Sequence, residues 1–130
     1  MKYLCLICAE KVMEQMPEDV AVRHFQEYTE FTNEIRASGH YLSCNRLMPP
    51  NEAITVRVRN GKVTTTDGPF VETKEQLGGY YLIEARDLNE AIQVAARIPG
   101  AKLGCVEIRP VAEDEQTLAA LGFVDKENYR

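Results

Sequence analysis

The strongest constraint on the fold is an Asn-Gly pair, Asn60-Gly61, that stands between two runs typical of β-strands. Residues 54–59 alternate strictly between apolar and polar side chains, and residues 62–66 are rich in valine and threonine. Asn-Gly favours the tight two-residue turn whose twist matches paired strands. The sequence therefore predicts an antiparallel β-hairpin over residues 54–66.

A long amphipathic helix is predicted before this hairpin. Pro17 suits the first helical position, acidic residues follow in the first turn, and Ser38-Gly39 closes the helix with glycine as the left-handed residue. Apolar and small side chains recur at steps of four and three, which places them on one helical face. We expect that face to be buried; its members are Ala21, Phe25, Tyr28, Thr32 and Ile35.

A second helix is predicted over residues 87–98. Asp87 is a suitable N-cap, and Glu90 three residues later completes a capping-box pattern. Pro99-Gly100 ends this helix. Its expected apolar face consists of Leu88, Ala91, Ile92, Ala95 and Ile98.

The remaining segments complete a recognisable order of elements. Strands are predicted at residues 2–8, 40–47, 80–85 and 104–109, and a short helix at 113–121. The order β-α-β-β(hairpin)-β-α-β predicts an α+β, ferredoxin-like sandwich with two helices on one face of an antiparallel sheet. We expect one domain over residues 1–111, followed by a C-terminal helix and tail over 112–130.

Charge and hydropathy narrow the classes of partner. The formal net charge is -5 and the pI is near 5.1. An acidic domain lacks the basic patch that binds nucleic acids and anionic membranes, so neither is an expected partner. No apolar run approaches the roughly 18 residues of a membrane helix. The apolar start ends at Glu10-Lys11 without a cleavage site, so we expect a cytoplasmic protein.

Sequence motifs for metal and cofactor chemistry are missing. Cys5 and Cys8 have C-x-x-C spacing, but residues three apart in a strand point to opposite faces, so we expect structural thiols. The sequence contains no glycine-rich phosphate loop, no paired histidines at metal spacing and no G-x-S-x-G turn. We therefore expect no metal and no cofactor.

The sheet face without helices is expected to bind a second copy of the chain. Alternation places Arg57, Arg59, Glu107 and Arg109 on this face, and we expect Tyr3, Cys5, Ile7 and Tyr81 to share it. Full exposure of such apolar groups to water is unfavourable, which predicts a homodimer with the two sheets face to face and a ligand cleft at the rim. The arginines either bind an anionic group or form ion pairs across the sheet.

Residues 67–79 read Asp-Gly-Pro-Phe-Val-Glu-Thr-Lys-Glu-Gln-Leu-Gly-Gly, and residues 104–110 read Gly-Cys-Val-Glu-Ile-Arg-Pro. These two segments resemble the YCII-related family in its DGPF-containing branch. The resemblance extends over residues 1 to about 111. It implies a bacterial protein with a dimeric α+β barrel fold. The family has been suggested to be enzymatic through a His-Asp pair, and some members are encoded beside extracytoplasmic-function sigma factors.

Asp67 and His40 are the candidate catalytic residues. Asp67 is either a general acid or base or a residue that holds a tight turn through backbone bonds. His40 is either its partner, as the resemblance implies, or a surface or capping histidine. His24 is expected at the surface and Phe70 as an anchor that packs its loop down. The candidate substrate-binding residues are Gly68, Pro69, Phe70, Glu72, Lys74, Tyr81 and Arg109.

Two functions from different classes are open at this point. The first is a small cofactor-free enzyme that performs acid/base chemistry on a small polar organic molecule with Asp67 and His40. The alternative is a non-catalytic ligand-binding or regulatory dimer, linked to sigma-factor regulation by the resemblance. The fold hosts both classes and does not decide between them.

Overall fold

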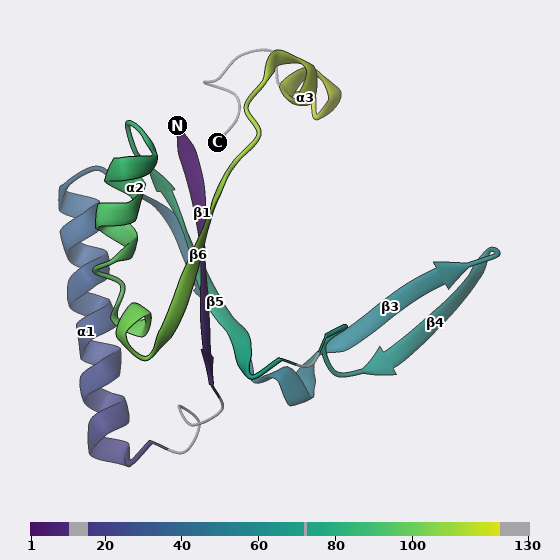
Figure 1. Ribbon diagram of the computed structural model, residues 1–130, viewed down its shortest axis with the longest axis horizontal. Helices are drawn as coiled ribbons and strands as arrows, with labels where there is room; N and C mark the ends of the chain where they lie inside the picture. The colour runs from purple at the N-terminus through teal and green to yellow at the C-terminus, as the bar shows by residue number, and fades with distance from the viewer. Residues whose placement is uncertain (11–15, 72, 123–130) are drawn as a thin grey trace.

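Four strands and two helices form the body of the protein in the computed structural model, which describes residues 1–10, 16–71 and 73–122. The sheet contains β1 (Lys2–Glu10), β2 (Tyr41–Arg46), β5 (Glu75–Glu84) and β6 (Gly104–Pro110) in the order β2-β5-β1-β6, with every neighbouring pair antiparallel. Helices α1 (Glu18–Ala37) and α2 (Leu88–Ala95) lie on the same side of the sheet (Figure 1). The predicted ferredoxin-like α+β fold is confirmed.

The predicted hairpin forms, but outside the main sheet. Among the described residues, strands β3 (Ile54–Arg59) and β4 (Lys62–Asp67) pair only with each other, and the turn residues Asn60 and Gly61 have φ values of 53° and 73°. Figure 1 shows the hairpin projecting from the base of β5, away from the helices. The expectation that its strands belong to the main sheet was wrong, because a 3-10 turn at Pro50–Glu52 directs the chain away first.

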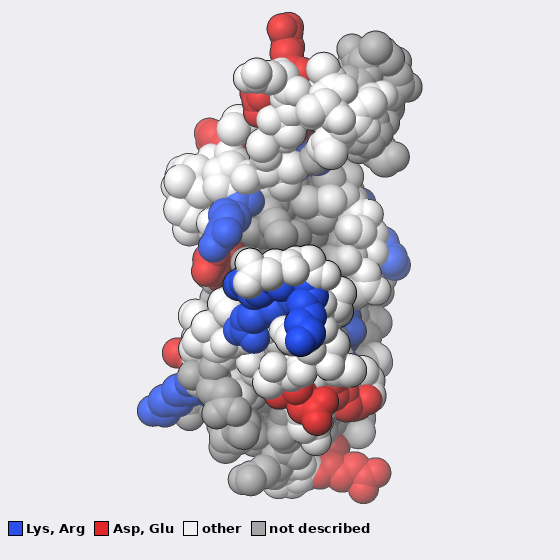
Figure 2. Space-filling model, turned by 90° about the vertical axis from the view of Figure 1, so that its right-hand side faces the viewer, with Lys and Arg blue, Asp and Glu red and all other residues white. Residues whose placement is uncertain are grey.

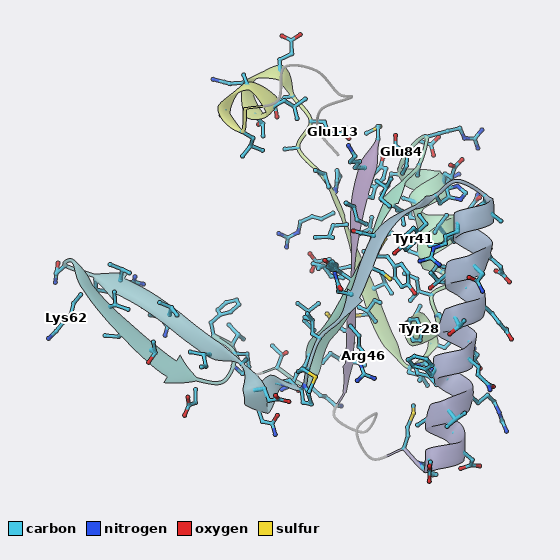
Figure 3. The ribbon with its side chains drawn as sticks, turned by 180° about the vertical axis from the view of Figure 1, so that it is seen from behind. Tyr28, Tyr41, Arg46, Lys62, Glu84 and Glu113 are labelled. Carbon is cyan, nitrogen blue, oxygen red and sulfur yellow. The ribbon has the colours of Figure 1, made fainter. Side chains whose placement is uncertain are left out.

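Helix α1 packs on the sheet with a face slightly different from the predicted one. Phe31 and Ile35 are buried, whereas Phe25 is 63% exposed. Tyr28 packs against the core, and in Figure 3 it lies with Tyr41 between α1 and the sheet. The contact seam therefore includes Phe31, which the predicted face omitted, and excludes Phe25.

Helix α2 shows a similar shift. Its buried residues are Ala91, Val94 and Ala95, while Leu88 and Ile92 remain about half exposed. The predicted N-cap is confirmed, since the Asp87 side chain accepts a hydrogen bond from the Glu90 amide at 2.8 Å. A 3-10 turn at Pro99–Lys102 follows, and helix α3 (Glu115–Ala120) starts after its N-cap Asp114.

The first strand faces in the direction opposite to the expected one. Tyr3, Cys5 and Ile7 belong to the core beneath the helices, as does Tyr81 on β5. Leu4 and Leu6 alternate with them and therefore line the open face. Both sets are apolar, so alternation alone does not decide which set the helices cover. On β6 the prediction was right, because Val106 and Ile108 pack on the core.

The open face is thus a mixed surface of apolar and polar side chains. Leu4 pairs with Leu82, and Leu6 with Tyr80, in the β1–β5 ladder. Cys105, Glu107 and Arg109 of β6 lie on the same side, and Arg109 contacts Glu107 at 2.8 Å. Among the described residues, no helix is long and apolar enough to cross a membrane.

Candidate functional site

The best-defined polar constellation is centred on His40, at the junction of α1 and β2. Helix α1 ends at Ala37 with Ser38 as its C-cap, and Gly39 with φ 82° reverses the chain as the sequence predicted. The His40 carbonyl then accepts a hydrogen bond from the Glu84 amide at 2.8 Å. His40 is therefore fixed at the end of β5 that lies beside the start of β1.

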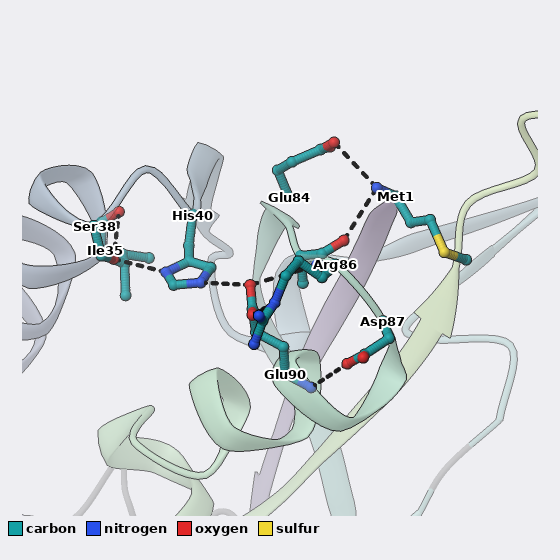
Figure 4. Close-up of polar contacts among 9 residues, drawn as sticks. Met1, Ile35, Ser38, His40, Glu84, Arg86, Asp87 and Glu90 are labelled. Atoms are coloured by element: carbon teal, nitrogen blue, oxygen red, sulfur yellow. Dashed lines mark hydrogen bonds and ion pairs between the residues drawn. The ribbon is translucent and has the colours of Figure 1, made fainter.

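Three side chains form one hydrogen-bonded chain at this position (Figure 4). The Ser38 hydroxyl lies 2.7 Å from His40 Nδ1, and His40 Nε2 lies 3.0 Å from Glu90 Oε1. Ser38 belongs to the end of α1, His40 precedes β2 and Glu90 belongs to the first turn of α2. The contact between His40 and Glu90 joins residues fifty positions apart, so the fold itself assembles the site.

Glu90 is held as a carboxylate. The hydrogen bond from His40 is the largest influence that lowers its pKa, and the neighbouring Arg86 guanidinium acts in the same direction against desolvation. A carboxylate only accepts hydrogen bonds, so His40 Nε2 carries a proton and donates it to Glu90. The Ser38 hydroxyl has one proton and two acceptors within reach, the Ile35 carbonyl at 3.2 Å and, with a neutral ring, His40 Nδ1 at 2.7 Å. When the proton points to Nδ1, the three groups have the polarity of a hydroxyl–imidazole–carboxylate relay.

A cleft of about 240 Å³ opens beside the relay. The side chains of His40 and Glu90 are 19% and 17% exposed, which gives each a limited face to solvent. Pockets for drug-sized ligands span about 300–1,000 Å³, so this cleft suits a smaller molecule. The lining residues are Met1, Ser38, Gly39, His40, Glu84, Ala85, Arg86 and Glu90.

Asp67 lies away from this cleft. It ends β4 at the root of the hairpin, whereas His40 lies beside Glu84 at the far end of the ten-residue strand β5. The expected His40–Asp67 pair does not form within one protomer, and Glu90 supplies the carboxylate instead. The sequence analysis named His40 as a candidate and Asp67 as its partner, whereas the structure pairs His40 with Glu90.

The Asp-Gly-Pro-Phe turn is held by groups other than Asp67. Gly68, with φ 95°, donates its amide to the Ala53 carbonyl at 2.7 Å and accepts from the Thr55 hydroxyl at 2.8 Å. Among the described residues, the Asp67 side chain makes no hydrogen bond. Phe70 is 78% exposed, so its expected role as an anchor was wrong within this chain.

The other predicted site residues are scattered. Pro69 is half-buried and Lys74 is exposed beside the same turn, and Glu72 lies outside the described residues. Tyr81 is buried in the core, where its hydroxyl lies 2.7 Å from the Thr32 hydroxyl, and Arg109 is on the open face. No single cleft among the described residues collects this set.

Two residues of the relay are not identified by the sequence patterns. The helix-ending pattern marks Ser38 only as part of the end of α1, and the capping pattern marks Glu90 only as part of a helix start. The capping pattern does place Glu90 in the first turn of α2. The capping pattern does not indicate that the N-terminus of α2 packs beside the end of α1.

Polar side chains also gather away from the His40 cleft. A groove of about 360 Å³ between α1 and the 3-10 turn is lined by Glu27, Glu30 and Glu34, with Arg97 and Lys102 as partners. His24 is half-buried, edge-on to Tyr28, and not at the surface as expected. Within the described part of the chain, no three histidine, cysteine or acidic side chains are arranged to hold a metal ion.

Comparison with known proteins assigns the family. The model of the YCII-related domain matches residues 1–115. An uncharacterised protein of Rhizobium meliloti (strain 1021), R00369, is 45% identical over 69 residues, which is 52% of this chain. The match spans 56% of that relative's length. The extent of the family match shows that this chain belongs to the YCII-related domain family.

Proposed function

We propose that this protein is a small acid/base enzyme that transfers protons on a small polar organic molecule bound beside His40. The observation that carries the proposal is the Ser38–His40–Glu90 relay opening onto a cleft of about 240 Å³. Proton transfer needs a group that can take up and release a proton and a second group that keeps it oriented. His40 and Glu90 supply these two roles.

The chemistry follows from the polarity of the relay. A substrate that displaces or hydrogen-bonds the exposed Ser38 hydroxyl presents its proton to His40 Nδ1, either directly or through that hydroxyl. The resulting imidazolium is stabilised by the Glu90 carboxylate and by the carbonyl end of α1. The proton then returns to a neighbouring atom of the substrate. Because Arg86 and two acidic side chains surround the cleft, a neutral polar or zwitterionic molecule fits better than a strongly charged one.

We also propose that the chain acts as a homodimer of the DGPF branch. Support comes from the hairpin, which among the described residues pairs with no strand of the main sheet. Ile54, Val56, Val58 and Val63 share one face of the hairpin and are 55–65% exposed. An isolated two-stranded hairpin is marginally stable, so this face favours packing against another protomer. Asp67 remains a candidate for ligand contact at the hairpin root.

Solvent-proton exchange tests the enzymatic proposal even while the natural substrate is unidentified. A panel of small hydroxy acids, amino acids, keto acids and amides is incubated in D₂O with the protein, and deuterium incorporation at carbon is followed by NMR. We expect at least one compound to exchange and to shift the amide signals of Ser38, Gly39 and Glu90. His40→Gln should reduce the exchange rate by about 100-fold or more.

The second histidine provides a matched control. The chain has two histidines, and His24 lies on α1 outside the cleft. His24→Gln should retain exchange in full. If compounds bind in the cleft but none exchanges or is converted, the proposal is contradicted and the non-catalytic binding dimer becomes the better account. If His40→Gln exchanges as fast as the wild type, the assignment of His40 is contradicted.

A further inference from the structure

Two cysteines face each other across β1 and the edge strand β6, at the end of the sheet away from His40. Cys8 of β1 is the direct register partner of Cys105 on β6, and both lie on the open face. The register between β1 and β6 is continuous from Tyr3 to Ala9. No shift in pairing therefore separates the two thiols.

The type of pairing sets the distance between the two backbones. Val111 donates its amide to the Lys2 carbonyl at 2.9 Å, so Lys2 and Val111 form a hydrogen-bonded pair. Pair types alternate along an antiparallel ladder, and Cys8–Cys105 lies six residues further, so it is of the same type. The α-carbons of such a pair are about 5.5 Å apart, inside the range of about 4.4–6.8 Å found for disulfides.

Gly104 holds β6 close to β1 beside the cysteines. A β-carbon at position 104 would lie 2.1 Å from the Cys8 carbonyl oxygen and 2.8 Å from the Ala9 α-carbon. Only glycine permits this approach without displacing backbone. The residue next to Cys105 therefore keeps the strand in contact with Cys8.

The surroundings explain which thiol a reagent meets first. Cys105 is exposed and Cys8 is half-buried, while Cys5 is completely buried on the opposite face. The hydrogen bond between the Cys105 thiol and Glu75 raises the pKa of Cys105 to about 11. Burial, together with Glu107 and Glu75, raises the pKa of Cys8. Both groups are thus thiols at neutral pH and become more nucleophilic as the pH rises.

We propose that Cys8 and Cys105 are a redox pair that closes reversibly into a disulfide within one protomer, with a small-molecule disulfide such as glutathione disulfide as oxidant. The Cys105 thiol loses its proton and its thiolate attacks one glutathione sulfur, which expels a glutathione thiolate and leaves a mixed disulfide. The Cys8 thiolate then attacks Cys105 Sγ and expels the second glutathione. The protein loses two hydrogens, and the two expelled thiolates take up the two protons.

The same pairing makes the disulfide easy to reduce. Opposed β-carbons in hydrogen-bonded pairs lie near the upper end of about 4.5–5.5 Å, whereas disulfides prefer about 3.8 Å. Closing the bond therefore strains the β1–β6 ladder, and strained disulfides are the labile ones. The pair responds to its redox surroundings instead of serving as a permanent cross-link.

Intact-mass analysis of the folded protein tests this proposal. After incubation with glutathione disulfide and quenching with acid, we expect the wild type to lose two hydrogens, remain monomeric in non-reducing denaturing gels, and yield a Cys8–Cys105 peptide link. Dithiothreitol should restore the original mass. The rate should rise about tenfold per pH unit between pH 7 and pH 9, as the thiolate fraction rises.

Cysteine variants identify the two positions. Cys8→Ser should stop at one glutathionyl group on Cys105, and Cys105→Ser should form no internal disulfide. Cys44→Ser is the matched control on β2 and should behave like the wild type. Far-ultraviolet circular dichroism confirms that each variant is folded. Unchanged wild-type mass, a link through Cys44, or cross-linking between protomers would overturn the proposal.

Discussion

The Glu90 side chain contacts both His40 and Arg86. The backbone amide of Glu90 is capped by Asp87. The cap places Glu90 in the first turn of α2, where its carboxylate accepts hydrogen bonds from the Arg86 amide and guanidinium and contacts His40. Sequence alone predicts the cap from a four-residue pattern, but the histidine contact depends on how α1 and α2 pack.

The lowered pKa of Glu90 makes a prediction about stability and pH. A carboxyl group whose pKa is lower in the folded state stabilises the protein above its unfolded pKa, and this contribution is lost as pH falls through the folded value. Glu90→Gln should therefore lower the free energy of unfolding at pH 7. The difference from wild type should shrink as the pH falls below the ordinary value of 4.5. Urea unfolding at several pH values measures it.

An exposed acid on α1 supplies the control for this prediction. Glu30→Gln removes the same formal charge at a residue outside the His40 cleft. Its effect on the free energy of unfolding should be smaller than that of Glu90→Gln at pH 7. Equal effects of the two substitutions would show that net charge, and not the His40 contact, accounts for the result.

At the scale of elements, a sequence pattern predicted that the hairpin forms but not which sheet its strands join. The alternation of β3 and the Asn60-Gly61 turn are local properties, so both were predictable. The sheet that a strand joins depends on the path of the preceding chain, which the alternation does not contain. The same limit applies to β1, because the side chains on both of its faces are apolar and the pattern does not say which face the helices cover. It also applies to α1, where Phe25 and Phe31 are equally apolar but only Phe31 is buried.

The two faces of the hairpin differ in chemistry. Val56 and Val58 share the apolar face, whereas Arg57 and Arg59 share the other face. Figure 3 places Lys62 at the tip, far from the sheet, and Figure 2 shows lysine and arginine side chains gathered where the hairpin points at the viewer. A dimer contact through the apolar face would leave the basic face toward solvent.

Substitutions on the two faces distinguish them. The double variant Val56→Thr/Val58→Thr keeps β-branched side chains but makes the contact polar, so it should weaken the homodimer by at least about tenfold in Kd. Arg57→Thr, on the opposite face, should leave Kd unchanged. Sedimentation velocity over a concentration series measures both. A wild type that stays monomeric, or a dimer indifferent to the valines, would contradict this role.

On the scale of the whole molecule, two separate chemistries lie at opposite ends of one sheet. The His40 relay is beside the start of β1 and the end of β5, whereas Cys8 and Cys105 meet near the other end of β1. A catalytic role for His40 stays a prediction. The fold class was predictable because it rests on the periodicity of apolar side chains. The relay was not, because its carboxylate comes from α2 through a contact between distant segments.

The most direct test of the central claim is the protonation pattern of the His40 ring. Nitrogen-15 NMR of the imidazole, with His24→Gln to leave one histidine, distinguishes the two neutral tautomers. In the neutral form we predict a single tautomer with the proton on Nε2, donated to Glu90, and in Glu90→Gln a mixture of both tautomers. A wild-type ring protonated on Nδ1, or a mixture that Glu90→Gln leaves unchanged, would contradict the account.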